Sequence, residues 1–148
     1  MNQPVNTVVL ATPEEQGSFG LGWFYLLTED YRYSWFAGDT KYRLTIRKGF
    51  RWDGASVPRL AWSVSGLTPD GPIRAAALVH DFGYRHDGVW PDGVIEVFDG
   101  DQWQPIKNVV WSRKETDRFF RWMMTDADMP EGQVNRAFKA VRLFARRW

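Results

Sequence analysis

Residues 72–86 read PIRAAALVHDFGYRH, and this stretch determines how the rest of the chain is interpreted. Pro72 suits the first turn of a helix and Asp70 can cap it, so the sequence predicts one helix over the whole stretch. Apolar residues lie on nearly every side of this helix, which should therefore be largely buried. His80 and Asp81 are polar residues within it, and a buried polar group is costly unless it has a partner. The pair is therefore predicted to form a catalytic or metal-binding centre.

Before this helix the sequence predicts antiparallel strands. Short runs of β-branched and aromatic residues alternate with glycine-containing turns, which is the pattern of a small sheet. The four runs are Val5–Leu10, Trp23–Leu27, Arg32–Phe36 and Tyr42–Ile46. The N-terminal third of the chain is therefore expected to be rich in strands.

After this helix the sequence predicts further strands and then two more helices. Residues 94–106 predict a β-hairpin, with two apolar runs around a turn at Gly100. Ser112 and Glu115 have the spacing of a capping box, so the second helix is expected to begin there. A last helix is expected from about Pro130 to the end of the chain.

Together these elements predict an α+β fold. A small N-terminal antiparallel sheet is followed by about three helices, and a β-hairpin is inserted between the first two of them. All 148 residues are expected to form a single domain. Its β-rich part is predicted over residues 1–50 and its helical part over residues 70–148, with the hairpin at about 94–106.

Composition excludes several classes of protein. The net charge is +1, so nucleic acid is not expected as a partner. The chain has no cysteine, which removes disulfide scaffolds, zinc ribbons and cysteine nucleophiles. No run approaches the ~20 apolar residues that span a bilayer, and the first residues lack the pattern of a signal peptide. Nine tryptophans are unusual and suggest that some rings face a partner, a ligand or a lipid boundary.

Asp117 is the predicted partner of His80. It lies at the edge of the apolar stripe of the second helix, where a carboxylate is better placed to face another helix than solvent. If the two helices pack antiparallel, Asp117 can accept from one ring nitrogen of His80 and leave the other as a general base for water. Asp81, about 100° around its helix, offers a hard oxygen ligand that suits calcium. The alternative is a buried His–Asp pair that only holds two helices together.

Two further segments have open interpretations. Residues 49–59 are either a structured connection or a loop that supplies Asp53 or backbone carbonyls as additional ligands. The C-terminal segment is locally basic, and cations at the end of a helix interact favourably with its dipole. These cations are Lys139, Arg142, Arg146 and Arg147.

The order of five motifs resembles that of a known family. The motifs are Lys48-Gly49-Phe50, residues 53–58 (DGASVP), His80-Asp81-x-x-Tyr84-Arg85, Ser112-Arg113-Lys114-x-x-Asp117-x-x-Phe120 and Ala140-Val141-Arg142. In this order they resemble domain-of-unknown-function family 1353, whose small members are found largely in phages and prophages. The resemblance covers about Leu44 to Trp148. It implies a phage protein in the cytoplasm of the infected bacterial host or in the virion, with other phage structural proteins, such as those of the tail, as partners.

The block from His80 to Arg85 is also similar to the active-site helix of bacterial and fungal secreted phospholipases A2. In those enzymes a second helix supplies an aspartate to the catalytic histidine, and Asp117 stands in the corresponding place. The resemblance implies a calcium-dependent hydrolase with His80 as general base and Asp117 as its orienting partner, and Tyr84 of the same block joins the catalytic candidates. It implies Asp81 and Asp53 as calcium ligands. The chain departs from those enzymes in having no cysteine, whereas they usually carry disulfides.

Two functions are therefore expected from the sequence. The first is a metal-assisted hydrolase of a phospholipid or other ester, in which a calcium ion near Asp81 polarises the substrate carbonyl. The second is a non-catalytic virion, tail or assembly component in which the His–Asp centre is structural. In that case Trp103 and Trp148 are expected at contact surfaces.

Overall fold

In the computed structural model of the protein, residues 7–10, 24–52 and 73–145 are described. The chain packs as two compact units. The sheet unit comprises residues 1–53 and 91–109, and the helical unit comprises residues 54–90 and 110–148. Each unit is therefore assembled from two separate stretches of the chain.

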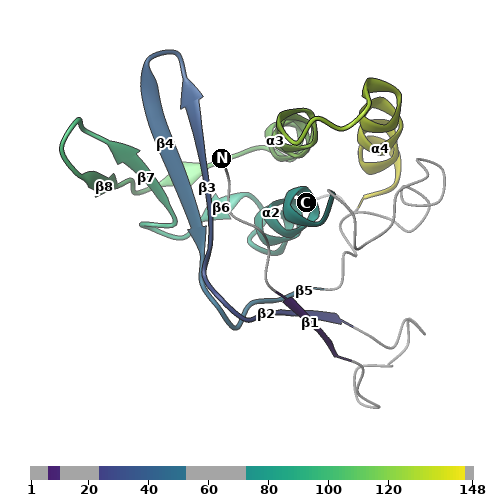
Figure 1. The fold of residues 1–148 in the computed structure, drawn as a ribbon, viewed down its shortest axis with the longest axis horizontal. Coiled ribbons are helices and arrows are strands. Elements are labelled where there is room, and N and C mark those ends of the chain that lie inside the picture. The colour runs from purple at the N-terminus through teal and green to yellow at the C-terminus, as the bar shows by residue number, and fades with distance from the viewer. Residues whose placement is uncertain (1–6, 11–23, 53–72, 146–148) are drawn as a thin grey trace. The chain divides into compact units, whose positions relative to one another are not determined.

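The sheet unit holds two antiparallel sheets among its described residues (Figure 1). The smaller has the order β1-β2-β5, with β1 at Thr7–Leu10, β2 at Phe24–Leu27 and β5 at Arg51–Trp52. The larger has the order β3-β4-β7-β8, with β3 at Tyr31–Ala37, β4 at Thr40–Ile46, β7 at Ile95–Phe98 and β8 at Trp103–Pro105. The neighbours β3 and β4 form a long hairpin that turns at Gly38, where the backbone φ is +61°.

Alternation along the strands decides which face of the larger sheet is buried. Tyr31 pairs with Ile46 and Tyr33 pairs with Leu44, and all four side chains are buried. Ile95 of β7 lies opposite Leu44 on the other side and extends the buried patch. Because successive residues of a strand point to opposite faces, these residues form one apolar face of the sheet unit.

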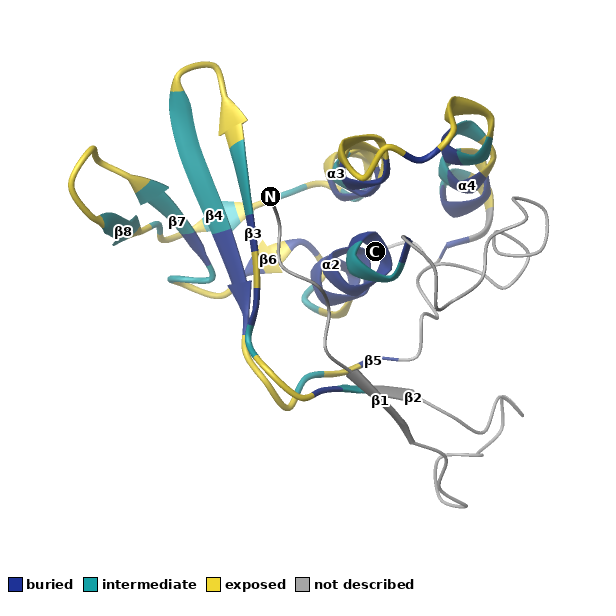
Figure 2. Ribbon diagram, viewed as in Figure 1, coloured by how far each residue is buried: buried dark blue, intermediate teal, exposed yellow. Residues whose placement is uncertain are grey.

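The helical unit contains three described helices: α2 at Ile73–Arg85, α3 at Arg113–Asp126 and α4 at Glu131–Phe144. Nearly all of α2 is buried, as its apolar residues on every side predict (Figure 2). At the start of α3 the Ser112 hydroxyl accepts from the Glu115 amide at 3.1 Å, and the Glu115 carboxylate accepts from the Ser112 amide at 2.7 Å. The predicted capping box is therefore confirmed.

The predicted α+β class is confirmed, with antiparallel sheets and three helices in the described part of the chain. The structure adds three strands that the sequence does not predict: β5, β6 at Val89–Trp90 and β9 at Val109–Val110, of which β6 and β9 pair with each other. Each has two residues, too few to show an alternating pattern. Pro72, Asp70 and residues 53–59 lie outside the described residues.

Gly83 lies where α2 packs against α3. A β-carbon added there would lie 2.9 Å from Cγ2 of Thr116 and 3.2 Å from Cζ2 of Trp90. Such separations leave no room for a methyl group unless the neighbours move. A glycine inside a helix lowers the stability of that helix, so its presence in α2 is explained by the close packing that it permits.

A Gly83→Ala variant should therefore be less stable than the parent by about 1–2 kcal/mol, because overpacking outweighs the better helix propensity of alanine. The matched control is Gly132→Ala, since Gly132 is exposed on α4 and an added β-carbon would meet only Nη1 of Arg136, at 3.6 Å. That variant should be neutral or more stable by up to about 1 kcal/mol. Urea unfolding measures both free energies, and an equal change in the two variants would contradict the packing explanation.

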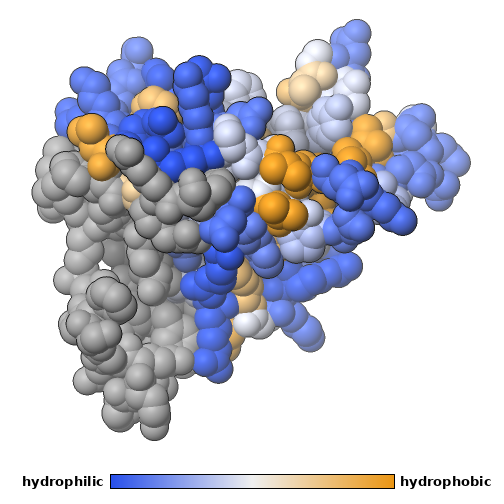
Figure 3. Space-filling model, turned by 180° about the vertical axis from the view of Figure 1, so that it is seen from behind, coloured by the Kyte–Doolittle hydropathy of each residue, from blue (hydrophilic) through white to orange (hydrophobic). Residues whose placement is uncertain are grey.

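Figure 3 shows mainly hydrophilic residues across the described part of one face, with apolar residues in smaller patches. The large apolar residues exposed among the described ones are Phe36, Val89, Phe98, Val110, Trp122 and Leu143. Among the tryptophans, Trp52 and Trp90 are buried and belong to the core. Within the described ranges, no helix has the length and apolar character needed to cross a membrane.

Candidate functional site

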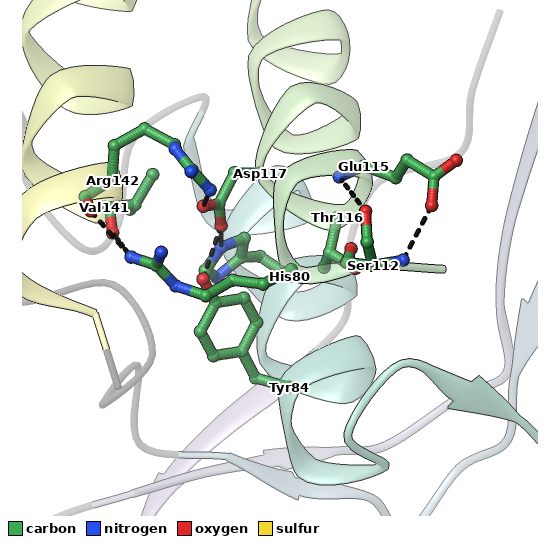
Figure 4. Close-up of polar contacts among 9 residues, drawn as sticks. His80, Tyr84, Ser112, Glu115, Thr116, Asp117, Val141 and Arg142 are labelled. Atoms are coloured by element: carbon green, nitrogen blue, oxygen red, sulfur yellow. Dashed lines mark hydrogen bonds and ion pairs between the residues drawn. The ribbon is translucent and has the colours of Figure 1, made fainter. Parts of the chain in front are cut away.

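The carboxylate of Asp117, on α3, lies at the centre of the candidate site (Figure 4). Its side chain is 0% exposed. Oδ1 lies 2.7 Å from Nε2 of His80 and accepts a hydrogen bond from the Tyr84 hydroxyl at 2.6 Å. His80 and Tyr84 are one turn apart on α2, so both side chains reach the same oxygen. The structure thus brings together His80, Tyr84 and Asp117, the three residues that the sequence selects as catalytic candidates.

The second oxygen of Asp117 is held from α4. Nη1 of Arg142 donates to Oδ2 at 2.7 Å, and 31% of the Arg142 side chain remains exposed. Arg113, one turn before Asp117 on α3, donates in the other direction, to the backbone carbonyls of Val141 and Arg142 at 3.3 and 2.6 Å. Two guanidinium groups therefore join α3 and α4, one contributed by each helix.

The surroundings of Asp117 favour its ionised form. Burial raises the pKa of its carboxyl, because a charge is less stable away from water. The hydrogen bonds from His80 and Tyr84, attraction to His80 and the hydrogen bond from Arg142 act in the opposite direction and together outweigh burial. The pKa of Asp117 is therefore lowered from its ordinary value of 3.8, and the group is an anion at neutral pH.

The ionised carboxylate fixes the tautomer of His80. A carboxylate can only accept hydrogen bonds, so Nε2 of His80 carries the proton that points at Asp117. In the neutral ring, Nδ1 then holds the lone pair. The ring also packs against Tyr84 and Phe120, with centroid separations of 4.2 and 5.0 Å. The imidazole is therefore held in one tautomer and one orientation.

Tyr84 acts as a hydrogen-bond donor in this cluster. Burial raises the pKa of its hydroxyl, and the hydrogen bond to Asp117 and the negative charge of that residue raise it further, while Arg113 has a smaller opposing effect. The phenol therefore keeps its proton throughout the neutral range, and the proton is directed to Oδ1.

Asp81, the predicted calcium ligand of α2, is buried, and its Oδ2 lies 3.8 Å from Nη2 of Arg85. Its carboxylate is a hard oxygen donor, which is the type of ligand that calcium prefers. No group of three or more His, Cys, Asp or Glu side chains within the described ranges could hold a metal ion. Asp53, the second predicted ligand, lies outside the described residues.

A comparison with protein families connects this geometry to a wider group. A family model described as protein of unknown function (DUF1353) matches residues 25–141, which is well over half of the chain. The chain belongs to the DUF1353 family. The matched range contains His80, Tyr84 and Asp117, and it ends one residue before Arg142. No curated protein and no solved structure matches the chain.

The sequence interpretation did not assign Arg142 to the site. Its cation is explained locally by the dipole of its own helix, whereas the structure directs the guanidinium to Asp117 on α3. The available signal was the Ala140-Val141-Arg142 motif, which accompanies the His80 and Asp117 motifs in the family resemblance. That motif singles out Arg142, but it does not identify Asp117 as the partner of the guanidinium.

Proposed function

We propose that this DUF1353 protein is a hydrolase of carboxylic esters, with phospholipids as its substrate class. The observation that carries the proposal is the bond of 2.7 Å between Nε2 of His80 and the ionised Asp117. A histidine whose Nε2 proton is held by a buried carboxylate presents its other nitrogen as a base, with the ring already oriented. The resemblance of residues 80–85 to the active-site helix of secreted phospholipases A2 supports the choice of substrate class.

In the proposed reaction, Nδ1 of His80 takes a proton from a water molecule whose oxygen attacks the ester carbonyl carbon. The bond between that carbon and the alkoxy oxygen then breaks, and the proton passes from His80 to the leaving oxygen. The products are a carboxylic acid and an alcohol, and His80 returns to its neutral form. Asp117 stabilises the imidazolium while it exists, because its negative charge lies against Nε2.

Asp81 would be the ligand that α2 contributes to a calcium ion. When bound, such an ion supplies Lewis-acid polarisation of the ester carbonyl. Since a carboxylate on α2 is one of the six to eight oxygens that calcium takes, further oxygens are required, and Asp53 is the second proposed ligand.

The purified protein should release fatty acid from at least one phospholipid in a panel of headgroups and chain lengths, with calcium supplied. Chelation with EDTA should abolish the activity, and readdition of calcium should restore it. An Asp81→Asn variant should require a higher calcium concentration, because it loses the charge of one ligand. Absence of fatty-acid release over the whole panel, from folded protein with calcium present, would reject the hydrolase.

A structural role for the same centre is the second candidate, because His80 is 1% exposed and the Asp117 side chain is 0% exposed. In this proposal the protein is a phage virion, tail or assembly component, and the His–Asp–Tyr cluster fastens α2 to α3. An exposed Trp122 on α3 (49%) then suits a contact with another phage protein. The protein should co-purify with particles from infected cells, and its absence from purified particles would reject this role.

A further inference from the structure

Arg142 makes a contact that its place in the chain does not require. A cation in the last turn of a helix already interacts favourably with the C-terminus of that helix. The guanidinium of Arg142 instead donates to the buried Oδ2 of Asp117 on α3, at 2.7 Å. The same carboxylate orients His80 through its other oxygen. Arg142 is thus separated from the imidazole by a single side chain.

We propose, building on the hydrolase function above, that Arg142 is a positioning residue for His80. By holding Oδ2, it leaves Oδ1 as the oxygen that accepts from His80 and Tyr84. The last side-chain torsion of an aspartate adopts a broad range of angles. A carboxylate without the Arg142 contact can therefore rotate and offer its oxygens differently to His80 and Tyr84. The Nε2 proton of His80 would then lose its fixed acceptor. Removal of the guanidinium also removes a charge that favours the ionised carboxylate.

The backbone of Arg142 is itself held in place. Arg113 donates to the Arg142 carbonyl at 2.6 Å, in the last turn of α4, where carbonyls lack partners within the helix. It also donates at 3.3 Å to the Val141 carbonyl, which accepts from the Ala145 amide as well. The Arg142 side chain therefore starts from a fixed point on α4 and ends on a fixed oxygen of α3. This arrangement makes α4 a part of the site, in addition to the α2–α3 pair that the sequence predicts.

The ring N–H proton of His80 gives a direct test by NMR. The chain has two histidines, so 15N-labelling of histidine gives two ring systems, and a His86→Gln variant assigns them. In the parent, the Nε2 proton directed at Asp117 should give a downfield signal that exchanges slowly with water. In Arg142→Met that signal should broaden or disappear at a temperature where the fold is intact. Arg142→Lys should recover part of it, because an ammonium group can also donate to Oδ2.

Arg136→Met is the matched control, since Arg136 is an exposed arginine on the same helix. It should leave the His80 signal unchanged. In the hydrolysis assay, Arg142→Met should lower kcat by about 10–10²-fold, the scale expected when a reacting group is misplaced, with little change in KM. The Lys variant should fall between the Met variant and the parent.

A His80 signal that persists in Arg142→Met, with only a lower melting temperature, would overturn the proposal. Arg142 would then only stabilise the packing of α4 against α3. The NMR comparison does not depend on turnover. A parent without hydrolytic activity would therefore reject the proposed function, while the His80 signal would still decide what Arg142 does to the ring. If Arg142→Met does not fold, Arg142→Lys should still give a weaker His80 signal than the Arg136→Met control, and a signal as strong as in that control would overturn the proposal.

Discussion

Replacement of His80 with alanine is expected to lower kcat for ester hydrolysis by about 10²–10⁴-fold, the usual contribution of a positioned general base. The alanine variant has no group that can take a proton from water at this point in α2. Asp117 is a poor replacement, because its two oxygens still accept from the Tyr84 hydroxyl and from Arg142. Fatty-acid release, with calcium and the phospholipid that the parent cleaves fastest, measures the loss.

His86→Ala is the matched control for this loss. His86 is the other histidine of the chain and follows the last residue of α2, where its ring contacts Phe82 at a centroid separation of 4.4 Å. Its removal should change kcat little, because its ring packs against Phe82 and takes no part in the hydrogen bonds to Asp117. His80→Gln controls for the cavity, since its amide can still donate to Asp117 but is not a base. A Gln variant as active as the parent would exclude His80 as the base.

Much of this site could be predicted because its residues violate local rules. His80 is a polar residue in a helix that is apolar on all sides, and Asp117 interrupts the buried edge of an amphipathic helix. Each requires a partner once buried, and the antiparallel packing of two helices offers each to the other. The contacts follow that geometry: Gly83 of α2 lies against Thr116, and His80, one turn earlier, lies against Phe120, one turn later.

Arg142 could not be placed from the same reasoning, because an arginine near a helix C-terminus violates no rule. The contact joins residues 25 positions apart on two helices, and it depends on how α3 and α4 pack. Propensity, capping and amphipathic periodicity all act within one helix. They predict that α3 and α4 exist and which of their faces are buried, but they leave the rotation of one helix against the other undetermined.

The strands show the same limit on a smaller scale. β3 has seven residues, enough for the alternation of the buried Tyr31 and Tyr33 with the exposed Arg32 to be visible in the sequence. β4 is as long, but it ends in three consecutive buried residues and shows no such alternation. β5, β6 and β9 have two residues each and exist only because a neighbouring strand supplies hydrogen-bond partners. Their two-residue sequences contain no pattern from which a strand could be predicted.

Loss of the Asp117 carboxylate should give the largest change in stability. Asp117→Ala leaves the Nε2–H of His80 and the hydroxyl of Tyr84 buried without their acceptor, at about 1–3 kcal/mol for each group. Arg142 can return part of its charge to water, because 31% of its side chain is already exposed. The free energy of unfolding should therefore fall by roughly 3–5 kcal/mol, as for other buried pairs that lose one partner. Lys114→Ala, at an exposed side chain on the same helix, should change it by less than about 0.5 kcal/mol.

Asp117→Asn separates the charge of the residue from its shape. All three neighbours donate to the native carboxylate, but an asparagine offers one acceptor and one donor. If its oxygen turns to Arg142, its NH₂ faces His80, which must then accept on Nε2 and carry its proton on Nδ1. The general base would be lost with the ring still in place. We expect a fall in kcat of about 10²–10⁴-fold, with a smaller loss of stability than in Asp117→Ala.

The pH dependence of stability tests the charge itself. The pKa of Asp117 is lowered on folding, so its contribution is fully present above the ordinary value of 3.8 and is lost as the pH falls through the folded value. The difference in unfolding free energy between the parent and Asp117→Asn should therefore shrink as the pH falls below about 4. Urea unfolding at a series of pH values measures it. A difference that stays constant, or grows, in acid would show that the buried carboxylate is protonated in the folded protein, and His80 would then have no anion to hold its proton.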